Sequence, residues 1–318
     1  VAILSQEAMS CYYSRSSLIH HQGTAGDTGA GRILLEGKYL FDVIDAEEPF
    51  EKYKLLILPD SIRLDAAMAD KVQAYVAGGG KVLASGTSCL FTDRDEFALE
   101  LGAVWKGAAA FRPVYFRPDF ELDCLRGSAY VIYEQAYDME AKPDARVLIH
   151  RENPYFNRTT FAFSSHQHTP NDKSKSYPAA TVGKDGAYIS AEIFAEYANK
   201  GSITTMLLGV IEALLADTKT IVTDLPAQGV VTLMDQCEQH RLVNHLLYAS
   251  PVKRGGGIEI IEDVLPVYNV HVTLRTDRTP KRVYLAPSGE DIPYTCENGA
   301  ISYTVEKLFI HQMVVIDY

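Results

Sequence analysis

The feature that most constrains this chain is a strand, a helix, a run of glycines and a second strand in immediate succession. Residues 54–59 are almost continuously apolar, which is typical of a parallel strand covered on both faces. In residues 64–77 the apolar side chains recur at helical spacing. Three glycines at 78–80 predict a left-handed helix end before the next strand at 81–84. Such a βαβ unit predicts a parallel sheet with a right-handed crossover.

Neighbouring segments extend this unit into a predicted α/β domain over residues 1–217. Two further strands are expected from short apolar segments at 1–4 and 41–45. A strand at 187–190 and an apolar helix at 203–215 are expected to close the same sheet. Between these elements, residues of about 103–182 alternate aromatic and polar side chains. We interpret them as a β-rich insertion against the edge of the sheet.

Residues 218–318 predict a second domain, because the helical period disappears there. Turn signals, among them the hairpin dipeptide Asn298-Gly299, separate short strand-like segments. Those segments are 229–234, 240–248, 267–274, 282–285, 300–305 and 312–316. Strands at this regular spacing predict a small antiparallel β-sandwich.

Composition and charge exclude several classes of protein. The formal net charge of −11 argues against a nucleic-acid partner, which requires a basic surface. No apolar run is long enough for a membrane span, and no signal peptide is visible. The five cysteines never occur in Cys-x-x-Cys spacing, so neither a disulfide framework nor a metal site is expected, and no cofactor is predicted. A reducing, cytoplasmic compartment fits this cysteine usage.

Three stretches of the sequence carry a resemblance to a known family. They are 52–60 with 75–83, then 153–159 with 165–170, and finally 261–270 with 311–315. Together they resemble the β-galactosidase trimerisation domain with its trailing β-domain, as found in bacterial glycoside hydrolases that also carry a fucosidase-like or amylase-like TIM barrel. The resemblance implies a flavodoxin-like, class I glutamine-amidotransferase-like parallel sheet. It also implies a homo-oligomer, with a trimer favoured, and a carbohydrate ligand.

The sequence offers no convincing set of catalytic carboxylates. Glu259, Glu262 and Asp263 are clustered, but neighbouring strand positions point to opposite faces, and a glycosidase pair needs a defined separation across a cleft. The chain opens on a predicted strand without an initiator methionine, and no barrel pattern is present. We therefore expect a non-catalytic accessory or oligomerisation region of a glycoside hydrolase, with the catalytic barrel elsewhere.

One polar loop stands out as a candidate substrate-binding segment. Residues 153–170 are bounded by prolines, and such polar, aromatic loops often carry function. Hydrogen bonds and a stacking face for a sugar are expected from Tyr155, Asn157, Arg158, His166 and His168. The two histidines would share one face of a strand, but no third metal ligand has a recognisable spacing. A purely structural role stays open, as does the possibility that the loop is lent to an active site.

Two other functions remain open. Cys89 follows a predicted strand, where amidotransferase-like folds place a nucleophile. No histidine partner is recognisable, so the favoured interpretation is that Cys89 is a small apolar side chain that fills space in the core. The β-domain could instead be a carbohydrate-binding module, although it offers tyrosines such as Tyr268 and Tyr294 but no Trp, the residue that sugar platforms often use. Gly26–Gly31 lacks the residues of a phosphate-binding loop and is expected to be a loop before a helix. His20 and His21 give no specific signal.

Overall fold

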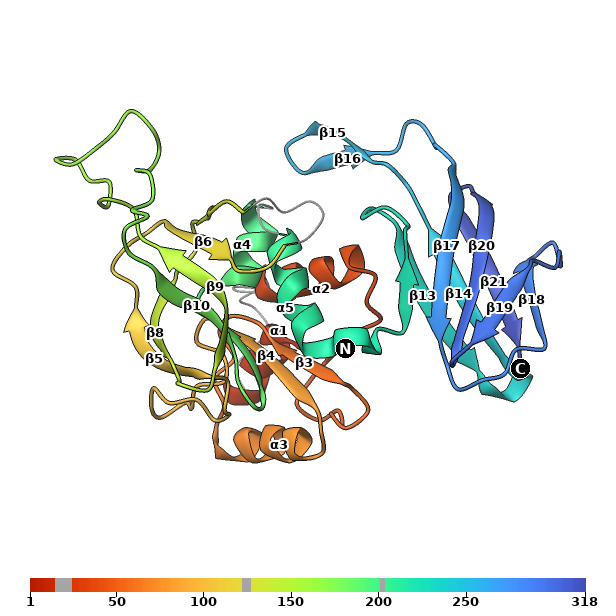
Figure 1. The fold of residues 1–318 in the computed structure, drawn as a ribbon, viewed down its shortest axis with the longest axis horizontal. Helices are drawn as coiled ribbons and strands as arrows, with labels where there is room; N and C mark the ends of the chain where they lie inside the picture. Colours follow the sequence, from red (N-terminus) through yellow and green to blue (C-terminus); the bar gives the residue numbers. More distant parts are fainter. Residues whose placement is uncertain (15–24, 122–126, 201–203) are drawn as a thin grey trace. The chain divides into compact units, whose positions relative to one another are not determined.

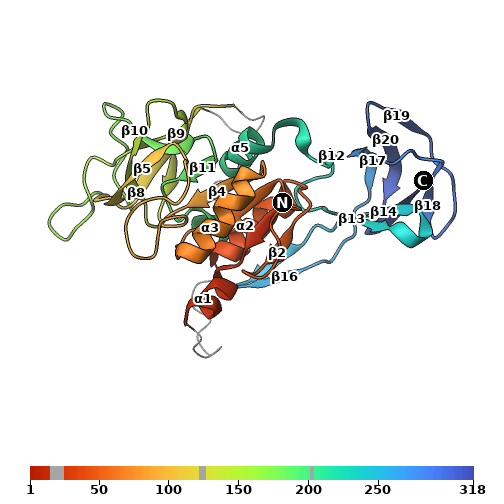
Figure 2. The same cartoon turned by 90° about the horizontal axis from the view of Figure 1, so that it is seen from below.

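The computed structural model describes residues 1–14, 25–121, 127–200 and 204–318. They form two compact units (Figures 1 and 2). The first unit comprises residues 1–33 and 41–216, and the second comprises 34–40 and 217–318. No helix in the described ranges is both long and apolar enough to cross a bilayer.

A mixed nine-stranded sheet organises the first unit, in the order β2-β1-β3-β4-β11-β10-β9-β6-β7. Figure 1 labels its strands β3, β4, β10, β9 and β6. The parallel strands are β1 (Ala2–Leu4), β2 (Asp42–Ile44), β3 (Leu55–Leu58), β4 (Lys81–Ser85) and β11 (Gly186–Ile189). The antiparallel continuation is β10 (Tyr177–Val182), β9 (Arg146–Glu152), β6 (Val114–Pro118) and β7 (Tyr130–Ile132). A separate two-stranded sheet pairs β5 (Ala103–Ala108) with β8 (Tyr137–Ala141).

The predicted flavodoxin-like, glutamine-amidotransferase-like parallel α/β fold is wrong. Strands dominate the described residues, with twenty-one strands and five α-helices, and the long sheet is only partly parallel. Residues expected to form an insertion at the sheet edge instead supply four strands of the sheet itself. The chain turns back tightly between β10 and β11, and such a hairpin needs no crossover helix. The strand at 187–190 therefore joins the sheet but does not close it.

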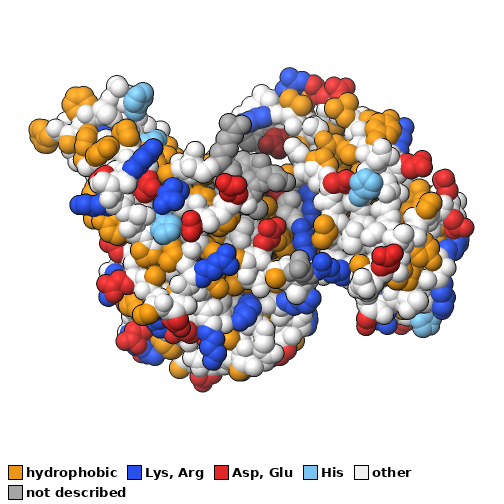
Figure 3. Space-filling view, in the orientation of Figure 1, with side chains coloured by type: hydrophobic (Ala, Val, Ile, Leu, Met, Phe, Trp, Pro, Cys, Tyr) orange, Lys and Arg blue, Asp and Glu red, His pale blue; other side chains and the backbone are white. Residues whose placement is uncertain are grey.

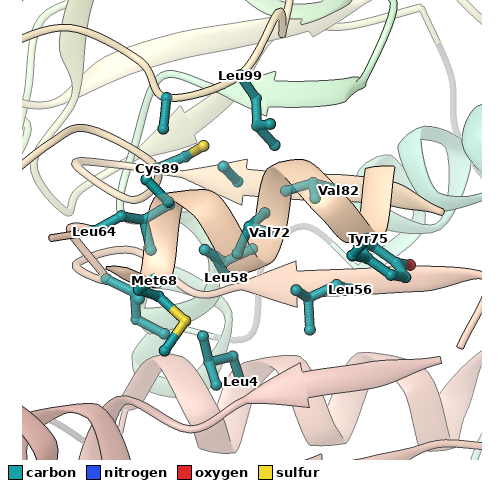
Figure 4. Packing of buried hydrophobic residues seen from close by; sticks show 14 of the residues in the cluster. Leu4, Leu56, Leu58, Leu64, Met68, Val72, Tyr75, Val82, Cys89 and Leu99 are labelled. Atoms are coloured by element: carbon teal, nitrogen blue, oxygen red, sulfur yellow. The ribbon is translucent and has the colours of Figure 1, made fainter. Parts of the chain in front are cut away.

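Helix α3 (Ala66–Ala77) shows how local sequence produces this unit. The Asp65 side chain accepts a hydrogen bond from Met68 N at 2.8 Å and so caps the helix. Met68, Val72 and Tyr75 are buried in an apolar cluster with residues of β1, β3 and β4 (Figure 4). At the other end the left-handed residue is Gly79, with φ +100°, whereas Gly78 keeps a right-handed helical conformation.

The remaining helices of the first unit are α1 (Gln6–Ser14), α2 (Ala25–Glu36), whose last residues belong to the second unit, α4 (Ile193–Lys200) and α5 (Thr204–Leu215). The glycine-rich segment expected as a loop is the first half of α2. A Cβ at Gly29 would lie 1.9 Å from the Phe194 carbonyl oxygen, so glycine there lets α2 approach the backbone of α4. Gly29 therefore serves helix packing.

Two antiparallel four-stranded sheets form the second unit. One has the order β12 (Ile221–Thr223), β17 (Val267–Arg275), β20 (Ala300–Leu308), β19 (Tyr294–Glu297). The other has the order β13 (Val230–Gln236), β14 (Arg241–Leu247), β21 (His311–Asp317), β18 (Arg282–Ala286). Both sheets contribute to one apolar core, and the buried Tyr303 hydroxyl donates to Asn244 Oδ1 of the opposite sheet at 2.7 Å. The second unit also contains a hairpin of β15 (Val252–Gly255) and β16 (Ile258–Ile260). Two short 3₁₀ turns occur at Ala216–Thr218 and Cys237–Gln239.

Candidate functional site

The carboxyl ends of the parallel strands are where open α/β sheets usually bind ligands. Asp60 lies two residues after the end of β3, is buried and has a φ of +50°. Its carboxylate accepts hydrogen bonds from Phe194 N at 3.2 Å and Ala195 N at 2.7 Å, in the first turn of α4, and from Ser85 Oγ at 2.7 Å. Burial raises the pKa of Asp60 to about 7. This carboxylate is occupied in capping a helix.

Asp27 has the same role at the start of α1. Its carboxylate accepts hydrogen bonds from Ser5 Oγ and Gln6 N, both at 2.8 Å. Burial raises the pKa of Asp27. Two carboxylates at this edge of the sheet are therefore satisfied by the protein itself, which leaves them poorly suited to hold a substrate.

Cys89 lies in the apolar core of the first unit. Figure 4 shows its side chain among apolar neighbours that include Leu64 and Leu99. The φ of +67° gives it the sharp backbone turn expected of a nucleophile, but burial raises the pKa of the thiol to about 12. A reactive thiolate is disfavoured at this position, which supports the interpretation of Cys89 as a filler.

The predicted substrate-binding loop forms a lobe that projects from the ends of β9 and β10, and we call residues 153–172 the aromatic lobe (Figures 1 and 2). Its base is closed by a bridge between Pro154 and Asn171 and by a hydrogen bond from Asp172 N to Asn153 O at 2.8 Å. Below the base, the buried Glu152 accepts hydrogen bonds from Arg117 Nε, at 3.0 Å, and from Asn171 Nδ2. The base of the lobe is firmly attached to the sheet.

Two of the predicted residues, His168 and Asn157, anchor the lobe. The His168 ring lies edge-on to Tyr115 and Tyr133, with centroid separations of 5.9 and 5.6 Å. Asn157 Nδ2 donates to Ala110 O at 2.7 Å, and Asn157 Oδ1 accepts from Arg112 N at 3.0 Å. These contacts fix the orientation of the lobe.

The other three predicted residues, Tyr155, Arg158 and His166, are exposed on the lobe. Beside them lie two phenylalanines that the sequence interpretation did not single out: Phe161 is 98% exposed and Phe163 is 70% exposed. Figure 3 shows hydrophobic and histidine side chains together on this projection. The available signal was a Phe-Ala-Phe sequence inside a polar, proline-bounded loop.

Other candidates from the sequence give no site. Glu259, Glu262 and Asp263 are exposed, and Glu262 forms an ion pair with Arg254. No cluster of three metal-ligating side chains occurs in the described parts of the chain. His20 and His21 lie outside the described residues.

Comparison with known proteins links the chain to glycoside hydrolases. Residues 33–103 match a family model described as the β-galactosidase trimerisation domain. No curated protein matches the sequence. The solved structure of α-L-fucosidase isoenzyme 2 from Paenibacillus thiaminolyticus is 44% identical, with a TM-score of 0.92. That match covers 100% of this chain and 48% of the fucosidase, so the chain spans about half the length of that enzyme.

Two β-galactosidases share the fold at much lower identity. The enzyme from Bacillus circulans sp. alkalophilus has a TM-score of 0.60, and a GH42 enzyme from G. stearothermophilus has a TM-score of 0.58. Each is 15% identical and matches 100% of this chain, with coverage of 41% and 40% of the respective enzyme. The association with glycoside hydrolases that the resemblance implied is therefore confirmed, whereas the glutamine-amidotransferase-like fold is not.

Proposed function

We propose that this chain is a non-catalytic accessory region of a glycoside hydrolase and that it assembles copies of that enzyme into a homo-oligomer, with a trimer favoured. The match to a trimerisation domain and the likeness to half of a fucosidase support this assignment. The chemistry of the chain is consistent with it. Asp60 and Asp27 cap helices, and Cys89 is buried with a raised thiol pKa.

The observation that carries the proposal is the aromatic lobe. Burying a Phe side chain is worth about 1.5–3 kcal/mol, so two phenylalanines held in water at the tip of an anchored lobe favour a partner surface. Aromatic residues are enriched at protein interfaces. Residues 154–171 contain no Asp or Glu but carry Arg158 and two histidines, while the whole chain has a net charge of −11. The lobe is thus less acidic than the chain as a whole, which favours its contact with another copy.

The lobe is also suited to reach an active site, its own or that of a neighbouring subunit. The anchored base limits the conformational entropy that the lobe would lose on binding. In this arrangement Tyr155, Arg158 and His166 would contact substrate hydroxyls. His168 and Asn157 would hold the lobe in position.

Light scattering on the 318-residue chain tests the assembly proposal. We expect a trimer at tens of micromolar for the wild type. The double substitution Phe161→Ser and Phe163→Ser should shift the mass toward the monomer, because it removes the apolar contact. Phe309→Ser is the matched control, since Phe309 is 53% exposed on the second unit, and it should leave the mass unchanged. A wild-type monomer throughout this concentration range would contradict the proposal.

A further inference from the structure

The second unit carries a groove of about 850 Å³ that the proposed function does not use. Its walls come from β17, β20 and β19 and from the connection 287–293 that joins β18 of one sheet to β19 of the other. This volume lies within the range of small-molecule sites, roughly 300–1,000 Å³. The groove is therefore large enough for one or two sugar rings.

One side of the groove is a double row of hydroxyl and imidazole groups. His271 lies directly opposite Thr304 across the β17–β20 pair, and His271 Nδ1 is 2.9 Å from Thr304 Oγ1. Two residues further along, Thr273 Oγ1 lies 3.0 Å from Ser302 Oγ. Each hydroxyl has three hydrogen-bonding positions and uses one in its pair. The pairs fix the side-chain rotamers and leave donors and acceptors for a polyhydroxylated ligand.

Apolar side chains contribute another part of the lining. Leu285, Ile292, Pro293 and Tyr294 border the groove, with Ile292 and Tyr294 packed against the core of the unit. Their attachment to the core gives the apolar surface a fixed shape. A sugar ring presents C–H groups on one face and hydroxyls around its edge. The lining offers hydroxyl groups for the edge of such a ring, and the exposed Pro293 beside the half-buried Tyr294 for its C–H face.

The charges of the lining select against anionic ligands. Glu290, Asp291 and Glu306 line the groove together with Lys307. Asp291 forms an ion pair with Arg282, and the net charge of the lining stays negative even when the Arg282 guanidinium is counted. Carboxylates accept hydrogen bonds from sugar hydroxyls but repel phosphate, sulfate and uronate groups.

We propose that this groove is a second, non-catalytic binding site for a neutral saccharide. The site would hold the protein on a glycan that presents many sugar units, and in an oligomer several such sites would act together through effective concentration. The proposal does not depend on the assembly of the chain, because all its residues belong to one unit of one copy.

Saturation-transfer NMR on the 318-residue chain tests the site with L-fucose, D-galactose and lactose as probes. These sugars are chosen because the similar solved enzymes are a fucosidase and β-galactosidases. We expect saturation transfer to at least one of them with a Kd on the order of 1 mM, and none to D-glucuronate at the same concentration. The strongest transfer should reach ring C–H protons that contact the apolar lining.

Two variants locate the binding in the groove. His271→Ala with Thr304→Val should weaken binding roughly 5- to 10-fold, because it removes one hydrogen-bonding pair. Glu306→Gln is a milder change at an exposed position and should weaken it about 3-fold. Thr232→Val, on an exposed position of the other sheet, and Glu297→Gln on β19 are the matched controls and should bind like the wild type.

Three results would overturn the proposal. The first is that none of the three neutral sugars shows saturation transfer up to about 20 mM. The second is that the groove variants and the controls bind sugar with equal affinity. The third is that sugar binding is lost when copies of the chain associate. The last result would make the groove an interface between copies. Since oligomer mass and sugar binding are measured separately, failure of the proposed assembly leaves this test intact.

Discussion

The carboxyl edge of the parallel strands and the aromatic lobe belong to the same unit but differ in what they expose: the carboxylates at the edge are buried or half-buried and hydrogen-bonded, whereas the phenylalanines of the lobe face water. At the strand edge, Asp60 and Asp27 have their hydrogen bonds filled by backbone amides and serine hydroxyls of the chain itself. On the lobe, Phe161 and Phe163 are open to water, while backbone hydrogen bonds hold the base on the sheet. A surface for a protein partner needs apolar side chains that are exposed in the free protein, and this criterion favours the lobe as the functional feature that we propose.

The two regions should also respond differently to substitution. The strand edge is held together by close backbone approach, as at Gly29, and by a buried carboxylate. Changes there should damage the fold. Changes on the exposed part of the lobe should leave the fold intact and alter what the chain contacts.

The largest effect is expected from the titration of Asp60. Its folded-state pKa, raised to about 7 chiefly by burial, lies above the unfolded value of 3.8, so the native state binds this proton more tightly. Its contribution to stability is fully present below pH 3.8 and is lost as the pH rises through about 7. The expected loss is on the order of 4 kcal/mol in the free energy of unfolding.

Urea unfolding of the wild type and Asp60→Asn from pH 4 to pH 8 measures this loss. The difference between the two profiles isolates Asp60, since Asn does not titrate. Asp277→Asn, at a side chain that is 93% exposed, is the control and should follow the wild-type profile. Parallel profiles for the wild type and Asp60→Asn would show that the strand edge is hydrated and open, which would break the contrast with the lobe.

A smaller but clear loss is expected from Gly29→Ala. The added Cβ would meet the Phe194 carbonyl oxygen at 1.9 Å, and both partners are backbone of packed helices that cannot move aside cheaply. We expect a loss of about 3 kcal/mol in the free energy of unfolding. Gly31→Ala in the same helix is the matched control. Its Cβ would lie 3.9 Å from the Phe41 ring, and the higher helix propensity of Ala should make it neutral or stabilising.

The sequence predicted best those parts of the fold that depend on local signals. The apolar run of β3, the helical period of α3 and the glycines before β4 each act over a few residues, and all three elements form as expected. The alternation within about 103–182 indicated strands but not their partners. Pairing direction depends on contacts distant in sequence, so the antiparallel half of the long sheet could not be anticipated.

The candidate sites, too, were predictable only where the signal is local in sequence. Prolines and the His-Gln-His sequence located the lobe, but exposure is a tertiary property, so the difference between the anchored His168 and the exposed Phe161 was not visible. The groove depends on the register of β17 against β20, which sets His271 opposite Thr304. No local pattern in either strand encodes that register.

The smallest expected effect compares the two histidines of the lobe. His168→Ala removes the ring that lies between Tyr115 and Tyr133, and should cost about 1 kcal/mol in the free energy of unfolding. His166→Ala removes an exposed ring and should change stability by less than about 0.5 kcal/mol.

In a protein that carries this chain together with a catalytic domain, His166→Ala should raise KM or lower kcat while leaving Tm unchanged. His168→Phe, which keeps an aromatic ring at the base, should recover most of the stability lost in His168→Ala. Wild-type kinetics for His166→Ala, with assembly unaffected by the phenylalanine substitutions, would reduce the lobe to part of the scaffold and leave the two regions alike in function.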